Sequence, residues 1–253
     1  MDTGGASMWR RDRACSITKQ FTAVLVMQQV EQGRIRLDGK VSDYLPDYPE
    51  RNGDRITIHH LLTHSAGIID FGHLFQYLSH GGSVNIAGFT LQVSGDETTP
   101  DYLSTWRLPH TRADLLGQFA DQDLLFSPGS QSQYSNYGYM LLAITLEEAT
   151  GRSYGDLFQE GILDPVGMEN TGIDVKRSIL ERRASGYYDR PLSGLENSAF
   201  LDMSITLGAG SLYSSVEDVF LFNKAVYSGQ LLSDDSLDHM MRAGYLGGHA
   251  LPG

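Results

Sequence analysis

Apolar side chains recur every three or four residues over much of the chain, which is the spacing of a buried helix face. The first such segment starts at Ser16 and ends before Gly33, a residue that favours helix termination. Its apolar positions are Phe21, Val24, Leu25, Val26, Met27 and Val30. Because these positions cover so much of the helix circumference, the sequence predicts a helix that is buried in the core.

Five later segments are also predicted to be helical, from their capping residues or their apolar spacing. Thr57 is suited to cap a short helix that Gly67 closes, and Gly151 is suited to stop a longer one. Ser215 opens a further helix with a capping-box pattern. The predicted helices cover residues 58–66, 111–121 and 137–149 and also start at residues 215 and 233.

Strand patterns are few and short, at residues 55–58, 184–188 and 212–213. Glycine and proline interrupt residues 68–110 repeatedly, which predicts a loop-rich insertion with short helices. Residues 1–13 begin with a glycine-rich stretch and are expected to be a frayed N-terminus. The pattern therefore predicts a helix-dominated α+β fold, with one domain over residues 1–253.

Composition narrows the function classes. The net charge of −12 argues against a nucleic-acid-binding or anionic-membrane-binding surface, which needs clustered cations. The single cysteine, Cys15, excludes an intramolecular disulfide and a multi-cysteine metal site. No apolar run reaches the ~18 residues of a membrane helix. We therefore expect a small-molecule or peptide substrate and no metal or organic cofactor; the composition leaves the oligomeric state open.

The first residues give one expectation about localisation. Residues 1–13 contain no apolar stretch that a signal peptide would use. If this N-terminus is genuine, the protein is expected to be cytoplasmic.

Ser16 and Lys19 form the first candidate site. They lie three positions apart at the start of the predicted buried helix, so their side chains share one face. A serine becomes a nucleophile when a base removes its proton, and a lysine can be that base when burial lowers its pKa. The positive end of the helix also favours developing negative charge. By spacing alone, Ser16 could equally cap an ordinary helix.

Tyr134 and Asn136 form the second candidate site, in the turn that leads into the helix at residue 137. A tyrosine there could pass a proton to a leaving group, and an asparagine amide could hold a substrate carbonyl. The other interpretation is a packing tyrosine beside an asparagine at the start of a helix.

Two further patterns have simpler structural explanations. Ser153 lies in a Gly-x-Ser-x-Gly sequence, as in the nucleophile elbow of α/β-hydrolases. That elbow needs a strand before the serine, whereas a helix is predicted here, so Ser153 as an esterase nucleophile is the weaker hypothesis. His60 and His64 have metal-ligand spacing but no glutamate in a HExxH pattern between them, which favours structural histidines.

Several blocks of sequence occur in the order known from one enzyme family. They are residues 14–23 with Ser16-Ile17-Thr18-Lys19, residues 31–38, 44–46 and 56–67, residues 126–129, Tyr134-Ser135-Asn136, and residues 164–168 and 208–214. The chain resembles the serine β-lactamase-like hydrolases, which include class C β-lactamases, D-Ala-D-Ala carboxypeptidases, D-aminopeptidases and related esterases. The resemblance covers most of the chain from Ala14 to about Met241.

The resemblance implies a β-lactamase/transpeptidase-like fold and a role for each motif residue. Ser16 would be the acylated nucleophile and Lys19 its activating base. Tyr134 would be the second proton-transfer group and Asn136 a substrate-binding amide. Half of the oxyanion hole would be the backbone N–H of Ser16, and the other half would come from a sheet strand.

The chain also departs from the family pattern. The third motif of the family reads Lys-Thr-Gly or His-x-Gly. No lysine in this chain is followed by Thr-Gly or Ser-Gly. His80-Gly81-Gly82 matches the second form but lies between the first two motifs, where the family does not place the third. His249 lies at about the right place in the order and is a candidate remnant of that motif for substrate binding. Sheet strands at both ends of the family fold are not recognisable, so we expect an incomplete antiparallel sheet in an apparently truncated chain. A catalytically impaired or inactive member that acts as a binding module is therefore the alternative hypothesis.

Overall fold

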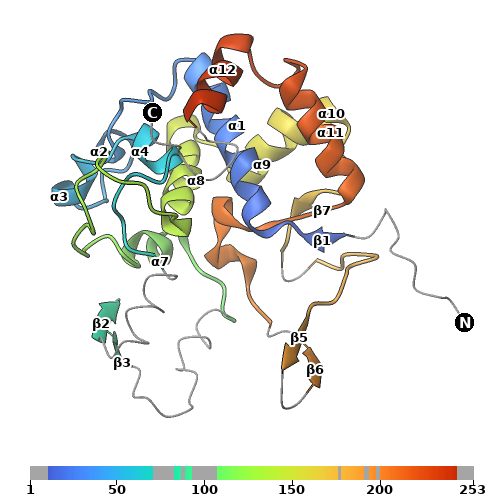
Figure 1. The fold of residues 1–253 in the computed structure, drawn as a ribbon, viewed down its shortest axis with the longest axis horizontal. Coiled ribbons are helices and arrows are strands. Elements are labelled where there is room, and N and C mark those ends of the chain that lie inside the picture. The colour runs from blue at the N-terminus through green and yellow to red at the C-terminus, as the bar shows by residue number, and fades with distance from the viewer. Residues whose placement is uncertain are drawn as a thin grey trace, which may run out of the picture.

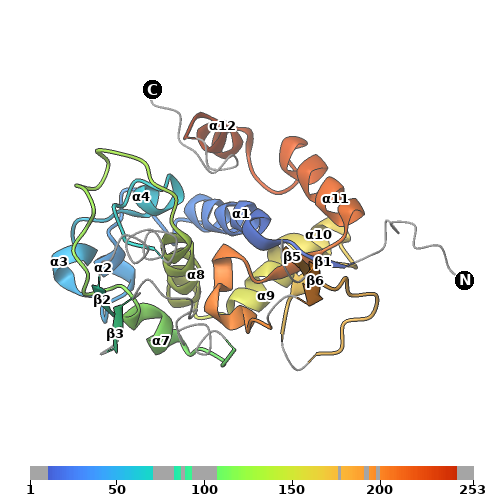
Figure 2. The same ribbon diagram turned by 60° about the horizontal axis from the view of Figure 1, so that its bottom comes forward.

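Two long helices form the centre of the protein. The structure is a computed structural model that describes residues 11–70, 83–86, 89–92, 107–175, 178–190, 194–197 and 200–243. Helices α1 (Thr18–Glu31) and α8 (Asn136–Thr150) lie side by side in both ribbon views (Figures 1 and 2). Most residues of each are buried, which matches the wide apolar arc seen in the sequence of α1.

The other helical segments pack around this pair. Helices α10 (Asp164–Val166) and α11 (Val216–Tyr227) lie together on the side of α1 away from α8 (Figure 1). The other α-helices among the described residues are α2 (Val41–Tyr44), α3 (Glu50–Gly53), α4 (Ile58–Leu62), α7 (Arg112–Gly117), α9 (Tyr154–Phe158) and α12 (Asp234–Ala243). Shorter turns of helix are η1 (Cys15–Ile17), η2 (Gln159–Leu163), η3 (Met203–Ile205) and η4 (Leu207–Ala209).

A small antiparallel sheet fixes the chain in front of α1. Strands β1 (Asp12–Arg13), β7 (Leu212–Ser214) and β4 (Gly172–Ile173) pair in the order β1-β7-β4. Strand β1 ends just before η1 and α1, so its pairing with β7 sets where α1 begins. Two hairpins complete the described strands, β2 (Ser83–Ile86) with β3 (Phe89–Gln92) and β5 (Tyr187–Arg190) with β6 (Gly194–Asn197).

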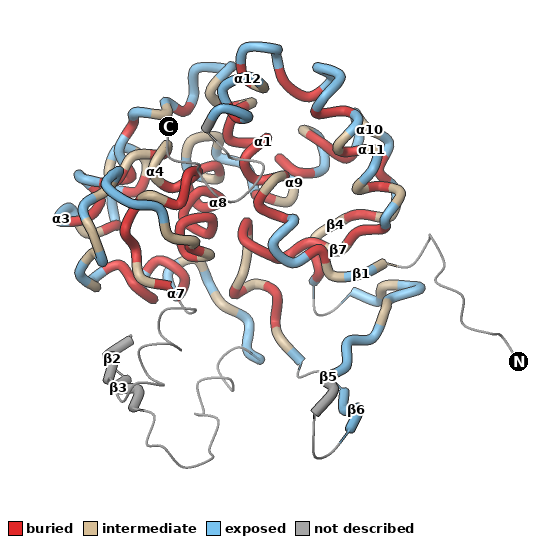
Figure 3. Tube along the Cα trace, in the orientation of Figure 1, coloured by how far each residue is buried: buried red, intermediate tan, exposed pale blue. Residues whose placement is uncertain are grey.

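The core joins α1 to the helices on both of its sides. Figure 3 shows α8 and β7 largely buried and the outer faces of α11 and α12 exposed. Phe21 of α1 stacks on Phe222 of α11 with ring centroids 3.7 Å apart, and it meets the edge of Phe158 of α9 at 5.6 Å. Burial of such aromatic side chains stabilises the fold by about 2 kcal/mol or more each. None of the described helices is long and apolar enough to cross a bilayer.

The capping residues act as predicted. The hydroxyl of Thr57 accepts the N–H of His60 at the start of α4, and Gly151 ends α8 at φ 67°. Ser215 caps α11 by accepting the N–H of Asp218. The helices predicted at residues 16–32, 58–66, 111–121, 137–149, 215 and 233 are all present, with shorter bounds for α4 and α7. The helix-dominated α+β prediction is confirmed.

Four local predictions need correction. The strand predicted at residues 55–58 is wrong, because the capping bond of Thr57 starts a helix there and only Thr57 itself bridges to Lys40. The strand predicted at residues 184–188 begins at Tyr187, where pairing with β6 starts. Part of the predicted frayed N-terminus is ordered, because Asp12 and Arg13 pair with β7. Residues 68–110 contain the β2–β3 hairpin, and residues 71–82, 87–88 and 93–106 lie outside the described residues.

Candidate active site

The candidate site lies where the starts of α1 and α8 meet η4, three elements that contact one another. Ser16 is exposed in η1, and its Oγ lies 2.6 Å from the Oη of Tyr134. Cys15, directly before it, has φ 45°, a left-handed conformation that non-glycine residues rarely adopt. The hydrogen bond from Ala14 N–H to the Leu212 carbonyl, at 2.7 Å, anchors this turn to β7. The strained turn therefore presents the Ser16 hydroxyl at the surface.

Lys19 is buried one turn into the helix, with its ammonium group held on two sides. Its Nζ donates to Oδ1 of Asn136 at 2.8 Å and to the carbonyl oxygen of Ala209 at 2.7 Å. It also lies 4.7 Å from the ring centroid of Tyr134. Burial lowers the pKa of Lys19 to about 8, while the charge of Asp70 and the Cys15 thiol act in the opposite direction. A lysine with this pKa is partly neutral near physiological pH, which a proton acceptor requires.

Tyr134 is partly buried above Lys19. Burial raises its pKa above the ordinary value, the hydrogen bond with Ser16 lowers it, and the charge of Asp70 adds to the rise. The phenol therefore stays protonated under conditions in which Lys19 loses its proton.

His64 holds the tyrosine loop in place. The N–H of Ser135 donates to its Nδ1 at 3.1 Å, the N–H of Gln133 donates to its carbonyl at 2.7 Å, and its ring lies 4.7 Å from that of Tyr134. His60 likewise accepts the N–H of Thr57 through Nδ1, at 3.2 Å. Both histidines bind backbone, as the structural interpretation predicted. Within the described part of the chain, no group of three or more His, Cys, Asp or Glu side chains is placed to hold a metal ion.

The geometry brings together four of the predicted site residues. Ser16 is hydrogen-bonded to Tyr134, Lys19 is hydrogen-bonded to Asn136, and the Lys19–Tyr134 ring contact links the two pairs.

Residues 11–250 match the protein-family model named Beta-lactamase. The chain belongs to the Beta-lactamase family.

Relatives of the chain include hydrolases and penicillin-binding proteins. Penicillin-binding protein 4* of Bacillus subtilis is 29% identical over 236 residues, which are 87% of this chain and 46% of that protein. The D-alanyl-D-alanine-carboxypeptidase/endopeptidase AmpH of Escherichia coli is 31% identical over 215 residues, 82% of this chain and 46% of AmpH. The chain thus spans about half the length of these curated relatives.

The fold is likewise that of the family. The crystal structure of a D-stereospecific amidohydrolase from Streptomyces sp. superposes with a TM-score of 0.76 and 27% identity, covering 92% of this chain and 66% of that one. This likeness confirms the predicted β-lactamase/transpeptidase-like fold, here helix-rich with a small antiparallel sheet.

In this Beta-lactamase-family chain, a buried polar network holds η4 (Leu207–Ala209) in place beside Lys19. Thr22, one turn along α1, donates to the carbonyl of Gly208 at 2.6 Å, and Tyr154 Oη lies 2.8 Å from the Thr22 hydroxyl. Gly208 precedes Ala209, whose carbonyl accepts the Lys19 ammonium. The network therefore fixes one of the two acceptors that orient Lys19.

Gly208 has no room for a side chain. A Cβ there would lie 2.7 Å from the Cβ of Ala143, 2.9 Å from the carbonyl of Tyr139 and 3.1 Å from the hydroxyl of Thr22. We expect Gly208→Ala to lower the free energy of unfolding by about 2 kcal/mol, because overpacking against backbone forces η4 to move. For a chain of this size, that lowers the thermal midpoint by about 4–8 °C.

Gly117→Ala is the matched control for this experiment, since a Cβ at Gly117 meets nothing within 4 Å. It ends α7, where alanine is the better helix former, so its thermal midpoint should hold or rise. A Gly208→Ala protein as stable as the parent would contradict the close packing of η4.

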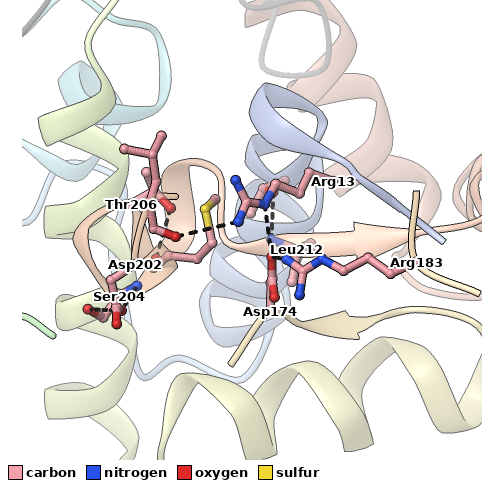
Figure 4. Close-up of polar contacts among 10 residues, drawn as sticks. Arg13, Asp174, Arg183, Asp202, Ser204, Thr206 and Leu212 are labelled. Atoms are coloured by element: carbon pink, nitrogen blue, oxygen red, sulfur yellow. Dashed lines mark hydrogen bonds and ion pairs between the residues drawn. The ribbon is translucent and has the colours of Figure 1, made fainter. Parts of the chain in front are cut away.

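A second polar cluster connects strand β1, which precedes Ser16, to the segment that leads into η4. Arg13 and Arg183 both bind Oδ2 of Asp174, which is 6% exposed, and the Nε of Arg13 lies 3.0 Å away (Figure 4). Arg13 also donates a hydrogen bond to the carbonyl of Leu201 at 3.4 Å. The next residue, Asp202, caps η3 because its side chain accepts the N–H of Ser204. The cluster therefore joins β1, the residue that follows β4 and the segment that leads into η4.

Asp174→Asn tests this cluster. The change leaves two guanidinium groups without their shared carboxylate, and we expect unfolding in urea to cost about 1–3 kcal/mol less. Asp123→Asn is the control, because the Asp123 side chain is 96% exposed in its ion pair with Arg51 and should change stability by less than about 0.5 kcal/mol. Equal changes in the free energy of unfolding for the two variants would show that the buried cluster does not stabilise the fold.

The remaining candidates fall outside this arrangement. Ser153 caps α9, donating from Oγ to Asp156 at 2.7 Å, and it follows the end of α8 and not a strand. The strand–turn–helix geometry of a nucleophile elbow is therefore not found at Ser153. His249 lies outside the described residues, as does His80.

Sequence reasoning missed several residues around the site, among them Asp70, Thr22, Tyr154 and Asp174. Asp70 offered a weak signal, since it is an acidic residue three positions after the predicted helix stop at Gly67. The carbonyl of Ala209 carries no side-chain signal at all, because any residue supplies one.

Proposed function

We propose that the protein is a serine hydrolase that acts through an acyl-enzyme on an ester, amide or β-lactam carbonyl. The observation that carries the proposal is the contact set of Ser16, Tyr134, Lys19 and Asn136, with a lysine pKa lowered to about 8. The substrate is a small molecule or a peptide.

The reaction begins when the Oγ of Ser16 attacks the carbonyl carbon and its proton passes to Lys19. Two features favour Lys19 as the resting place of that proton. Burial lowers its pKa to about 8, so roughly one molecule in ten has a neutral lysine at pH 7. Burial raises the pKa of Tyr134, which disfavours a phenolate.

Tyr134 passes a proton to the leaving group. Its hydroxyl lies 2.6 Å from Ser16 Oγ, so it is close to any bond that breaks at the acylated carbonyl. As the tetrahedral intermediate collapses, the C–O or C–N bond breaks, the leaving oxygen or nitrogen takes the proton of Tyr134, and the Lys19 ammonium returns the Ser16 proton to Tyr134. Water then attacks the acyl-Ser16 ester and gives one proton to the neutral Lys19. As the bond from the acyl carbon to Ser16 Oγ breaks, that proton passes to Oγ and the acid leaves.

Asn136 orients both the base and the substrate. Its Oδ1 accepts the Lys19 ammonium at 2.8 Å, which assigns the oxygen to that side and leaves the amide N–H groups for a substrate carbonyl. Ser16 lies in η1, directly before the N-terminus of α1, so a positive helix end and the backbone N–H of Ser16 are near the developing oxyanion.

The relatives narrow the substrate class. AmpH is named a D-alanyl-D-alanine-carboxypeptidase/endopeptidase, and the Streptomyces protein is a D-stereospecific amidohydrolase. We therefore favour an amide or peptide bond at a D-amino acid residue as the substrate, with a simple ester as the alternative.

Labelled penicillin and a fluorophosphonate probe test the proposal. Covalent labelling followed by release of the penicilloyl group would support a hydrolase. Labelling without release would support an acyl-binding protein, and no labelling with either probe would contradict the proposal in favour of a binding module. Labelling that persists in Ser16→Ala and disappears in Ser153→Ala would favour the esterase hypothesis instead.

A further inference from the structure

Asp70 is a buried carboxylate beside the candidate active site to which the proposed reaction assigns no task. Its side chain is 1% exposed, and its Oδ2 accepts the N–H of Asn136 in the first turn of α8. Ionised carboxylates are rarely buried unless a charge or a polar partner compensates them. The position of Asp70 next to the Lys19–Asn136 pair therefore calls for a physical role.

The backbone before Asp70 is built to hold it there. Gly67 has φ 73°, and a Cβ at this position would collide with the carbonyl oxygen of Phe126. The carbonyl of Gly67 accepts the N–H of Leu125 at 2.7 Å. The segment after α4 is thus pinned against residues 125–126, three residues ahead of Asp70.

Few titratable groups surround the Lys19 ammonium besides Asp70. The titratable groups that face Lys19 in the described residues are Asp70 from the segment after α4, Cys15 from η1, Tyr134 from the loop before α8 and Tyr139 from α8. Tyr139 Oη donates to the carbonyl of Leu62 at 2.9 Å. Element η4 contributes only the Ala209 carbonyl. Asp70 is therefore the fixed negative charge of this set.

We infer that Asp70 is the counter-charge for the Lys19 ammonium that forms when Ser16 gives up its proton, and thus a positioning residue of the reaction. The inference rests on the proposed function. When the Ser16 O–H bond breaks and the Lys19 N–H bond forms, a positive charge appears in a buried site; the Asp70 carboxylate compensates it, whereas a phenolate at Tyr134 would place two negative charges together. Asp70 thereby directs the proton to the lysine and keeps Tyr134 protonated for the leaving group.

Asp70→Asn isolates the charge. The asparagine oxygen can still accept the N–H of Asn136, so the contact at the start of α8 is kept while the negative charge is removed. Asp218→Asn is the matched control, because Asp218 is 2% exposed and accepts backbone and hydroxyl hydrogen bonds from Asn170, at 2.8 Å, and Thr171, at 2.7 Å. Both variants remove one buried carboxylate charge, but only Asp70 faces Lys19.

The readout is the titration of Lys19 by NMR in protein labelled with ¹³C at the lysine Cε, where the chain offers four signals. We expect the Lys19 midpoint to fall by at least about half a pH unit in Asp70→Asn, a threefold change in proton affinity, and to stay at the parental value in Asp218→Asn. An unchanged or raised midpoint in Asp70→Asn would overturn the inference.

A second measurement needs no variant. In the parental protein, the ¹³C signal of the Asp70 carboxyl is expected to show a step at the Lys19 midpoint, and its absence would also overturn the inference. Neither titration uses a substrate, so the result is separate from the labelling test. Probe labelling of the parent without these titration effects refutes the counter-charge alone, whereas the effects without labelling refute the proposed hydrolase.

Discussion

Replacing Ser16 by alanine is expected to reduce kcat/KM for a chromogenic ester or D-amino acid amide by at least about 10³-fold. The Oγ of Ser16 is the atom that is hydrogen-bonded to Tyr134, and in the proposed mechanism it is the atom that carries the acyl group. Without it, Lys19 has no hydroxyl to deprotonate, and only water remains as a nucleophile. The change removes one exposed oxygen, so the fold should be undisturbed.

Ser153→Ala is the control for this result. Ser153 Oγ takes part in the cap of α9 and bonds to Asp156 at 2.7 Å, so its loss should lower stability by about 1 kcal/mol. Its kcat/KM should stay within about twofold of the parent. Loss of activity in Ser153→Ala together with full activity in Ser16→Ala would reverse the assignment of the nucleophile.

Lys19→Met is expected to cost about 10³-fold in the rate of acylation, measured by stopped-flow with a fluorescent penicillin or by burst kinetics with an ester. Methionine keeps an unbranched chain in the buried site but cannot accept the Ser16 proton. Lys40→Met is the control, since Lys40 is exposed. Acylation at the parental rate in Lys19→Met would remove Lys19 from the proposed mechanism.

The proposed role of Lys19 also predicts how acylation of the parental protein depends on pH. Because the pKa of Lys19 is lowered to about 8 and only its neutral form accepts a proton, acylation should rise with pH and level off above about pH 8. The contribution of Lys19 to the free energy of unfolding should also rise with pH. The unfolded lysine has its ordinary pKa of 10.5, so between about pH 8 and pH 10.5 the unfolded state binds more protons, and the free-energy cost of burying this lysine falls as pH rises. Lys19→Met should remove that contribution.

Local patterns in the sequence predicted the helices and the motif residues. Capping chemistry can be recognised without the fold, because Thr57, Gly151 and Ser215 each act within one turn of their own position. Ser16 and Lys19 likewise share a helix face by spacing alone. Residues 55–58 are the exception: the sequence predicts a short strand there, whereas the Thr57 hydroxyl caps helix α4.

The surroundings of the site depend on contacts between distant segments. Ala209 meets Lys19 across 190 positions and Arg13 meets Asp174 across 161, and no periodicity or cap records either contact. Asp70 could be seen as an acidic residue after a glycine, but its burial beside Asn136 follows from how α4 and α8 pack. The sequence therefore indicates the candidate reacting groups, and the fold supplies the charges and carbonyl groups that surround them.

Mass spectrometry of the protein after reaction with a fluorophosphonate decides whether Ser16 is the nucleophile, because an activated serine oxygen bonds to the phosphorus and displaces fluoride. Intact-mass analysis should show one adduct per chain, and peptide mapping should locate it on Ser16. The adduct should be absent from Ser16→Ala and form faster as pH rises toward about 8. An adduct on Ser153 or on any other residue, or no adduct in the parental protein, would contradict the account.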